Sequence, residues 1–350
     1  MIDSLHIERF RGFRDLSISG LRRINVVVGK NASGKTALLE AIRVGLAGTP
    51  QVLWQINQSR LATFAIQMGF SRENFENIWS SDFYNLDSSQ PISFEFHDNS
   101  NHTATLKIFY DTEKAVTSIP EQPSAAPFNI APLVFDRVDF AGEKSRLTTT
   151  IQAQGALQMG QGAELGLVSE FHSSNPSGQQ NASFFSLLSV TNREKEIVDA
   201  MREEFSPLIE DLTVLSPQSV PVLYAVVPGL KDKVPISLLS SGINKLFAIL
   251  SAMIIRSNGV VLIDEIDNGF YYDRLESIWR ILYSLSVKHN TQVFASTHSI
   301  ECLRALDKVI KGNEEDFTLL RADRNEDGSH VAIVEGVFLK SALEQGFDPR

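Results

Sequence analysis

Eight consecutive residues near the N-terminus have the composition of a loop that holds phosphate groups. They fit the pattern G-x-x-x-x-G-K-[ST] in full: Gly29, Lys30, Asn31, Ala32, Ser33, Gly34, Lys35 and Thr36. In such a loop the glycines let the backbone curl around phosphate oxygens, Lys35 can reach the β- and γ-phosphates, and the Thr36 hydroxyl can serve Mg²⁺. The segment therefore predicts a site for ATP and Mg²⁺.

Two neighbouring acids, Asp264 and Glu265, follow the apolar run VVLI at 260–263. A carboxylate at the end of a buried strand is costly unless it has a function. We expect Asp264 to hold the water shell of Mg²⁺, so that Thr36 and Asp264 form the metal site. Glu265 is predicted to be the catalytic base that polarises the attacking water.

The polar segment STHS at 296–299 ends another apolar run. A lone histidine is more often structural, but His298 is predicted here to sense the γ-phosphate or the attacking water. The other histidines have no metal-ligand spacing and are expected to be ordinary surface or loop residues: His6, His97, His102, His172, His289 and His330. The single cysteine, Cys302, excludes a disulfide framework and a cysteine metal cluster.

A second helix start with anion-binding character lies about two hundred residues after the first. Ser240, Ser241 and Gly242 precede a long apolar helical pattern, and small residues at a helix N-terminus favour an anion. Because the chain already has a complete phosphate loop, this second start is predicted to face outward and to cap the ATP of another copy. Two chains arranged head to tail would then enclose two ATP molecules.

Sequence periodicity predicts the elements that position these residues in the first part of the chain. Residues 5–20 read as a strand, a turn and a strand, and 24–28 as a strand buried on both faces. A helix with one buried stripe is expected over 35–47, and antiparallel strands over 92–97 and 105–111. The stretch 145–190 is rich in Gln, Ser, Gly and Ala, and we predict helical segments with loose loops there.

Alternating strands and helices are predicted again from residue 235 onward. Strands are expected at 259–265 and 291–297, and helices after Gly242, at 272–289 and at 300–306. The predicted fold class is α/β, a P-loop nucleoside triphosphatase with a mostly parallel core sheet flanked by helices, an N-terminal antiparallel β subdomain and a helical insertion. We expect one domain over 1–350 with three parts, 1–144, 145–215 and 216–350.

Charge is distributed unevenly along the chain. The net charge is −10, but the first sixty residues carry nine Lys/Arg and four Asp/Glu, which is +5 and leaves −15 for the remainder. A basic N-terminal face could contact nucleic acid; the alternative is that Lys35 serves phosphate and the arginines are solvated. The sequence contains no run of about 18 apolar residues and no signal-peptide pattern, so we expect no membrane contact and a cytoplasmic location.

The combined motifs resemble the ABC-type ATPase superfamily, and within it the RecF, SMC and OLD (overcoming lysogenisation defect) branch of AAA-type ATPases, often linked to phage defence. IERFRGFRDL and INVVVGKNASGKTALLEAI are similar to the N-terminus of that branch, and the tail from 317 onward is similar to the ending of its stand-alone members. LLSSGINKL resembles the signature loop, LIDEIDNGF the Walker B motif and D-loop, and STHS the switch. The resemblance implies D-loop roles for Asp267 and Asn268, and a homodimer or higher even oligomer.

Some positions depart from the family pattern. Tyr271 stands where family members often have histidine, which leaves the role of this position open. The Q-loop glutamine is not identifiable, and the candidates are Gln51, Gln55, Gln58 and Gln67. Long coiled-coil arms are not expected, and because the sequence has neither a D-x-D nor an E-x-K pair, we do not expect the chain to cut DNA itself.

Three functions fit these observations. The first is an ATP-gated switch that controls a separately encoded effector or nuclease, in anti-phage defence. The second is a DNA-maintenance ATPase of RecF type that clamps DNA. The third, a transporter's nucleotide-binding subunit, is disfavoured by Asn268-Gly269 after the Walker B acids and by the N-terminal FRGF segment.

Overall fold

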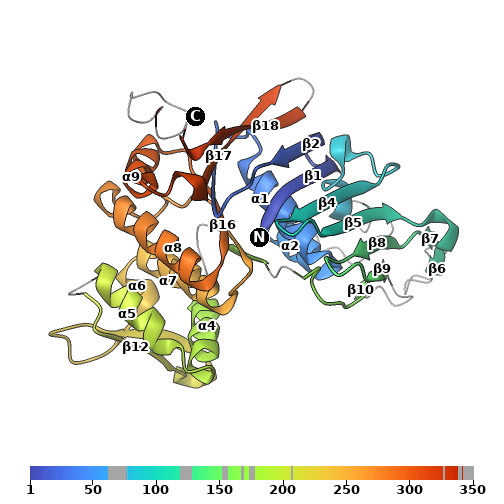
Figure 1. The fold of residues 1–350 in the computed structure, drawn as a ribbon. Coiled ribbons are helices and arrows are strands. Elements are labelled where there is room, and N and C mark those ends of the chain that lie inside the picture. The colour runs from blue at the N-terminus through green and yellow to red at the C-terminus, as the bar shows by residue number, and fades with distance from the viewer. Residues whose placement is uncertain are drawn as a thin grey trace.

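The computed structural model places most of the chain. The residues it describes are 1–61, 76, 78–118, 128–151, 157–166, 169–172, 178–205, 208–325, 328–337 and 341. Two large sheets and the helices around them make up this part (Figure 1). None of the helices in these ranges is long and apolar enough to cross a membrane.

The core sheet has six strands in the order β11-β15-β16-β3-β17-β18. All neighbours are parallel except the last pair, β17 and β18. The strands are β3 (Ile24–Val28), β11 (Ser169–His172), β15 (Val260–Ile263), β16 (Gln292–Ser296), β17 (Phe317–Asn325) and β18 (Gly328–Glu335). Since β16 lies between β3 and β15, the ends of these three strands meet at one edge of the sheet.

Alternate residues of the core strands pack into two different hydrophobic cores, as the two-residue period of a strand requires. Val27 and Leu262 contact the core shared with the antiparallel sheet, whereas Val26, Val28 and Ile263 contact the core on the other face. That second core is covered by α7 (Ser241–Ile255), α8 (Leu275–His289) and α9 (Ile300–Ile310). Burial on both faces explains the continuous apolar runs in the sequence.

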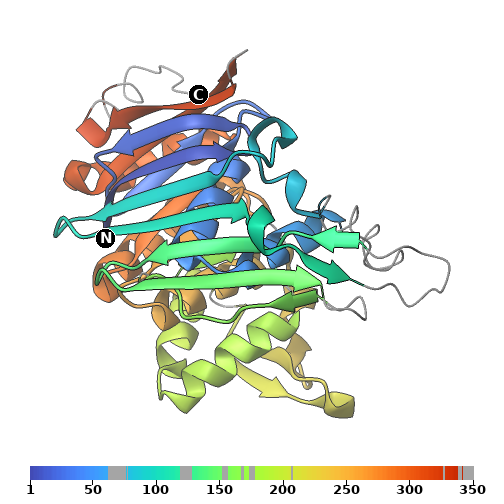
Figure 2. The same ribbon diagram turned by 90° about the vertical axis from the view of Figure 1, so that its right-hand side faces the viewer.

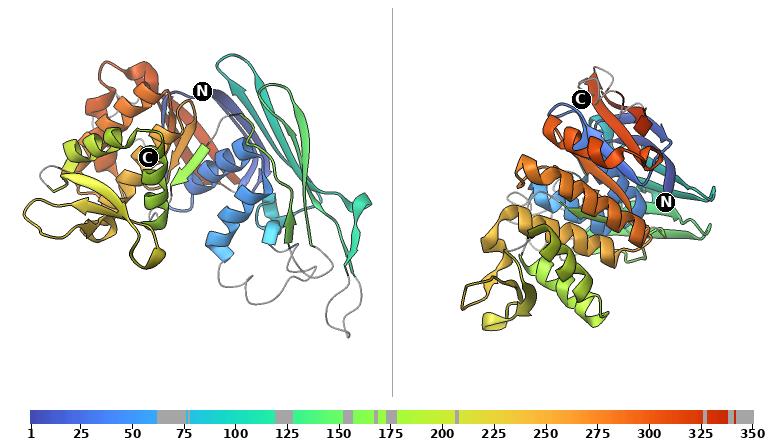
Figure 3. Two further views of the ribbon diagram at one scale, coloured as in Figure 1. Left: turned by 90° about the horizontal axis from the view of Figure 1, so that it is seen from below. Right: turned by 60° about the vertical axis from the view of Figure 1, so that its left-hand side comes forward.

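A seven-stranded antiparallel sheet lies beside the core sheet, in the order β10-β9-β8-β5-β4-β1-β2. Its strands are β1 (Ile2–Phe10), β2 (Phe13–Ser19), β4 (Ile92–Asp98), β5 (Thr103–Tyr110), β8 (Leu133–Val138), β9 (Lys144–Ile151) and β10 (Leu157–Met159). Helices α1 (Lys35–Ala47) and α2 (Pro50–Leu61) cover one face, and Figure 3 shows α1 between the two sheets. Among the described residues, none of the labelled α-helices covers the other face (Figure 2).

Smaller elements complete the described chain. At the end of the molecule away from β17 and β18 lie α4 and α5 with the three-stranded sheet β12-β13-β14 (Figure 1). The bounds of these elements are α4 (Gly178–Val190), α5 (Glu194–Phe205), β12 (Asp211–Leu215), β13 (Val222–Val226), β14 (Val234–Pro235) and α6 (Ile236–Leu239). Strands β6 (Val116–Ser118) and β7 (Phe128–Ile130) form a separate two-stranded sheet.

The predicted elements from 1 to 111 and from 241 to 310 are confirmed, but the prediction for 145–190 is wrong in its first half. Strand β9 pairs with β8, β10 extends the same sheet, and β11 joins the edge of the core sheet. The β-branched residues Thr148, Thr149 and Thr150 favour a strand, and β8 offers a pairing partner only a short turn away. The helical insertion predicted over 145–215 is therefore restricted to α4 and α5, and its first boundary falls inside β9.

Candidate nucleotide site

The phosphate loop connects the buried strand β3 to helix α1. Its backbone turns through positive φ at Gly29 (145°), Ala32 (62°) and Gly34 (106°). A Cβ at Gly29 would lie 2.2 Å from the carbonyl oxygen of Ala322, so only glycine fits there. No side chain caps the start of α1, which leaves the amides of its first turn available to an anion.

Lys35 and Ser33 are two polar side chains of this loop that are suited to contact a phosphate group. The Lys35 ammonium donates to the carbonyl oxygens of Gly29 at 2.7 Å and Lys30 at 2.9 Å. Desolvation lowers the Lys35 pKa from its ordinary value, while the nearby acids oppose the shift. The Ser33 hydroxyl is buried and makes no hydrogen bond within the described chain. A cation and an unsatisfied hydroxyl at a helix start fit a phosphate group.

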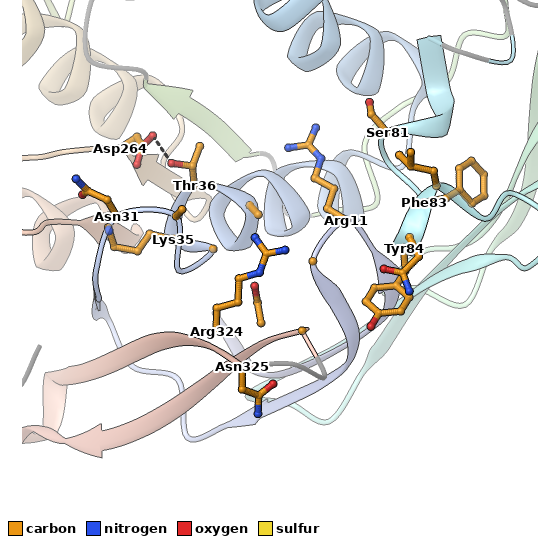
Figure 4. A pocket seen from close by; sticks show the side chains of 18 of the residues that line it. Arg11, Asn31, Lys35, Thr36, Ser81, Phe83, Tyr84, Asp264, Arg324 and Asn325 are labelled. Atoms are coloured by element: carbon orange, nitrogen blue, oxygen red, sulfur yellow. Dashed lines mark hydrogen bonds between the residues drawn. The ribbon is translucent and has the colours of Figure 1, made fainter.

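Asp264 accepts hydrogen bonds on both carboxylate oxygens, which fixes its orientation. The Thr36 hydroxyl donates to Oδ2 at 2.9 Å (Figure 4). The Ser296 hydroxyl donates to Oδ1 at 2.5 Å. A hydroxyl beside a carboxylate is a ligand set that suits Mg²⁺, so the predicted metal residues are brought together. No role for Ser296 was predicted from the sequence, although this residue lies in the STHS segment.

Glu265 lies at the edge where β15 and β16 end. Its amide donates to Ser296 Oγ at 2.8 Å, and its backbone has a positive φ of 49°, which is uncommon for a residue with a side chain. Asn268 Nδ2 donates to Glu265 Oε2 at 3.3 Å, so the D-loop contacts the proposed base. Glu265 and the exposed His298 line the same cavity.

Lys245 is a second functional candidate that sequence reasoning missed. This side chain is buried under the Walker B segment, where its ammonium donates to the carbonyl oxygens of Asp264 at 3.2 Å and Glu265 at 2.5 Å. Desolvation lowers the Lys245 pKa to about 8, although nearby carboxylates favour the charged form. The available signal was a lysine inside an otherwise apolar helical stretch.

A cavity of about 760 Å³ is lined by Lys35, Thr36, Asp264, Glu265 and His298 together. One wall carries Lys35, Thr36 and Asp264, and the opposite wall carries Tyr84, while Arg324 points between them (Figure 4). Arg11 also lines the cavity, but its guanidinium forms ion pairs with Glu40 and with Asp82, the latter at 3.0 Å. The volume suits a nucleotide, with the phosphates at the α1 end.

The signature loop lies outside the described lining of this cavity. Ser240 and Ser241 are exposed, as predicted, but the helix start is not entirely free, because the Ser240 hydroxyl accepts the amide hydrogen of Ile243 at 3.0 Å. Gly242 is buried, and a Cβ there would lie 2.3 Å from the carbonyl oxygen of Gly269. The signature loop therefore packs directly against the D-loop.

The remaining predicted positions are distributed around this core. Asp267 accepts from the Thr297 hydroxyl at 2.6 Å, which joins the D-loop to the switch segment. Gln51, Gln55 and Gln58 lie on α2, and Gln51 donates to the carbonyl oxygen of Gly160 at 2.8 Å. Gln67 lies outside the described residues. None of the three described glutamines lines the cavity, so the Q-loop residue is not located.

A phosphate loop between a buried strand and a helix, with an acid pair two strands away in the same sheet, is the arrangement of a P-loop nucleotide-binding fold. The sequence profile described as "AAA domain" matches residues 4–206, which is more than half of the chain. The chain therefore belongs to the AAA domain family. A second AAA domain profile, whose description also names the AbiEii toxin and a Type IV TA system, matches residues 167–304.

Individual relatives are distant. An "ATP/GTP phosphatase" of Helicobacter pylori is 24% identical over 344 residues, covering 91% of this chain and 90% of the relative. A "DNA replication and repair protein RecF" of Idiomarina loihiensis is 46% identical over 41 residues, 12% of this chain and 12% of the relative. The crystal structure of an SMC head bound to the C-winged helix domain of ScpA has a TM-score of 0.49 and 14% identity, covering 98% of this chain and 99% of that one. The SMC head domain of Thermotoga maritima has a TM-score of 0.41 and 15% identity, covering 95% and 99%. These two structures are too distant to carry an inference about function.

Proposed function

We propose that this chain binds and hydrolyses ATP with Mg²⁺. The single observation that carries the proposal is the convergence of Lys35, Thr36, Asp264 and Glu265 on one cavity. The amides at the start of α1 and the Lys35 ammonium would hold the β- and γ-phosphates. Thr36 and Asp264 would hold Mg²⁺, which when bound neutralises phosphate charge. The full-length relative named as an ATP/GTP phosphatase supports this reading.

Glu265 is the proposed base, because the base must lie within reach of water at the γ-phosphate. Glu265 lines the cavity, and its Oε2 accepts a hydrogen bond of 3.3 Å from Asn268 Nδ2. His298 lines the same cavity and is proposed to contact the γ-phosphate or this water. Ser296 orients both acids at once, since its hydroxyl donates to Asp264 and accepts the Glu265 amide hydrogen.

The signature loop is proposed to act on the ATP of a second copy. Ser240 and Ser241 are exposed and lie off their own chain's cavity lining, which is the arrangement that a head-to-tail dimer needs. The neighbouring D-loop segment ends in two tyrosines whose exposed fractions, 81% for Tyr271 and 74% for Tyr272, are large for aromatic side chains. Such exposed rings favour burial against a partner. The assembly would be a homodimer or a higher even oligomer.

Dimer closure on ATP is proposed to control a separately encoded effector or nuclease, in anti-phage defence. Support comes from the family description that names the AbiEii toxin and a Type IV TA system. The division of a single domain into 1–144, 145–215 and 216–350 stays a proposal, with the helical part of the middle segment restricted to α4 and α5. In this proposal the chain acts on the effector through the conformational change of dimer closure, and no nuclease activity is assigned to it.

The alternative function, a DNA clamp of RecF type, is supported by the short RecF match. This alternative is weakened because several of the N-terminal lysine and arginine side chains already contact groups of the chain itself. Four of the nine make contacts within the described chain: Arg11 pairs with Asp82, Arg43 pairs with Glu164, Arg23 donates to the carbonyl oxygen of Ser286, and Lys35 donates to the carbonyl oxygens of Gly29 and Lys30. Fewer charges are then available for phosphate contacts than the sequence count indicates.

Phosphate release by the purified chain tests the proposed activity. The wild-type chain should release phosphate from ATP only with Mg²⁺, and Lys35→Ala should remove both nucleotide binding and turnover. Survival of both in Lys35→Ala would refute the assignment. The same assay with added duplex DNA, or with a neighbouring gene product, separates the two functions, because a clamp responds to DNA alone.

A further inference from the structure

The outward face of the β1–β2 hairpin carries a cluster of metal-binding side chains. In β1, Leu5 and Ile7 point into the core, so the alternate residues His6 and Glu8 point to the opposite face. Asp15 of β2 lies on the same face. In the part of the chain that the structure describes, no α-helix covers this side of the antiparallel sheet (Figure 2).

The register of the hairpin places these three side chains together. Glu8 lies directly opposite Asp15, and His6 Nε2 lies 2.9 Å from Asp15 Oδ1. One ligand atom of each residue lies within 4.8 Å of the others. We propose that His6, Glu8 and Asp15 bind a divalent transition-metal ion such as Zn²⁺.

Electrostatics favours a cation at this position. Two carboxylates directly opposite each other on paired strands repel. Within the described ranges, no lysine or arginine forms an ion pair with Glu8 or Asp15, and His6 is the basic side chain that contacts Asp15. A divalent ion would neutralise both carboxylates, which a neutral imidazole does not do.

The ligand set and its spacing suit such an ion. One imidazole nitrogen and two carboxylate oxygens are ligands that Zn²⁺ accepts, at distances of about 2.0–2.2 Å. Two ligands of one ion at these distances are about 3.0–3.4 Å apart for bond angles between a right angle and a tetrahedral one. The His6–Asp15 distance of 2.9 Å is close to this range, and a Glu8 carboxylate oxygen lies within 4.8 Å of both other ligand atoms. Three protein ligands leave further positions for water.

The site is separate from the nucleotide-associated metal site. Thr36 and Asp264 lie at the edge of the core sheet, whereas this cluster lies on the outer face of the antiparallel sheet. Its hairpin turn nevertheless reaches the nucleotide cavity, since Arg11 and Gly12 line it. A bound ion would link β1 to β2 a few residues before this turn and hold the hairpin in place.

Metal titration of the full chain tests the proposal. The protein is stripped of metal with a chelator, and Zn²⁺ binding is measured by calorimetry near neutral pH without nucleotide, with Co²⁺ absorption as a second readout. We expect the wild type to bind one Zn²⁺ ion per chain tightly, and the affinity for this ion to fall at least about tenfold in His6→Gln and in Glu8→Gln. Unchanged melting of the metal-free variants shows that these substitutions of half-buried side chains leave the fold intact.

Two control variants make the result specific. His102 and Asp98 form another exposed pair on this sheet, at 3.0 Å, and no third metal-binding group joins them in the described chain, so His102→Gln should bind Zn²⁺ like the wild type. Asp264→Asn, in the nucleotide site, should also bind Zn²⁺ at the hairpin cluster with the wild-type affinity. Equal weakening in His102→Gln, equal affinity of wild type and His6→Gln, or no binding at millimolar Zn²⁺ would each overturn the assignment. None of these measurements depends on ATP hydrolysis.

Discussion

The ammonium of Lys245 donates a hydrogen bond of 2.5 Å to the carbonyl oxygen of Glu265. Lys245 lies on α7, one turn after the signature loop, and Glu265 is the proposed base. The contact is buried, and it holds a residue whose φ is positive. One side chain therefore joins the loop proposed to act on a partner's ATP to the acid that acts on the chain's own ATP.

Replacement of Lys245 by methionine should separate catalysis from folding. Lys245→Met keeps the length of the side chain but removes the ammonium and with it both hydrogen bonds to the Walker B backbone. We expect turnover to fall by about tenfold, roughly the effect of losing one hydrogen bond to a charged group. Nucleotide affinity, measured by calorimetry, should stay within a factor of a few, since Lys245 does not line the cavity. The free energy of unfolding should change by less than about 2 kcal/mol, because relief of the buried charge offsets the lost hydrogen bonds.

The matched control for this variant is Lys308→Met. Lys308 is an exposed lysine that pairs with Glu276 at 2.6 Å, and its loss should alter neither turnover nor stability. Full activity of Lys245→Met would show that the contact with Glu265 is structural only.

The lowered pKa of Lys245 gives its stability contribution a defined pH dependence. The folded-state pKa is about 8, below the ordinary 10.5, so the folded state loses this proton at lower pH than the unfolded state does. Between these two values the unfolded chain binds more protons at this group, and stability therefore rises with pH, by at most about 1.4 kcal/mol per pH unit. Denaturant unfolding of wild type and Lys245→Met, compared from neutral pH to pH 10, should show the wild type gaining relative to the variant. A difference that is constant across this range would contradict the burial of a titrating lysine.

Glu265→Gln should trap the nucleotide. The amide keeps the shape of the side chain but cannot accept a proton, so turnover should fall by about 10²- to 10⁴-fold while ATP still binds. Single-turnover measurement of ATP cleavage separates this step from product release. As a control, Glu276→Gln on α8 lies outside the described cavity lining and should hydrolyse ATP like the wild type. Unchanged single-turnover cleavage in Glu265→Gln would assign water activation to another residue, with His298 as the first to test.

Contact between Gly242 and Gly269 predicts that the signature loop tolerates no side chain at Gly242. A Cβ there would lie 2.3 Å from a backbone oxygen and 2.9 Å from the Phe270 ring, and backbone cannot easily move away. Gly242→Ala should therefore lower the unfolding free energy by about 1–3 kcal/mol and reduce turnover, as thermal melting and phosphate release would show. Gly178→Ala is the control, since among the described residues no heavy atom lies within 4 Å of its added Cβ. Equal stability of the two variants would contradict this packing.

Local motifs allowed the core strands β3, β15 and β16, the phosphate loop and the acid pair to be predicted from sequence, because each depends on residues that are contiguous in the chain. The other core strands, β11, β17 and β18, were not predicted. Lys245 and Ser296 could not be assigned in the same way. Their partners are the backbone of Glu265 and the carboxylate of Asp264, which only the order of strands in the core sheet brings near. Strand β9 was missed because its threonines are a weak strand signal beside the Gln, Ser, Gly and Ala residues that follow, and its pairing with β8 cannot be read from the segment alone.

The proposed metal cluster shows the same limit. His6 and Asp15 are nine residues apart, a spacing that matches no metal motif, and their contact depends on the register of the β1–β2 hairpin. Periodicity predicted the strand, turn and strand correctly. It did not predict which residues face each other, since a shift of one residue in register would exchange the two faces of a strand.

Mixing two inactive variants should decide whether the signature loop acts in trans. In a head-to-tail dimer of Lys35→Ala and Ser241→Glu chains, one site combines an intact phosphate loop with an intact signature loop. Random pairing of equal amounts should then restore about a quarter of the wild-type phosphate release. The control mixture, Lys35→Ala with Glu265→Gln, should stay inactive, because both changes affect the side of the site that holds the chain's own ATP. If the first mixture forms mixed pairs but releases no more phosphate than the control, or if Ser241→Glu alone is fully active as a monomer, the proposed dimeric site is wrong.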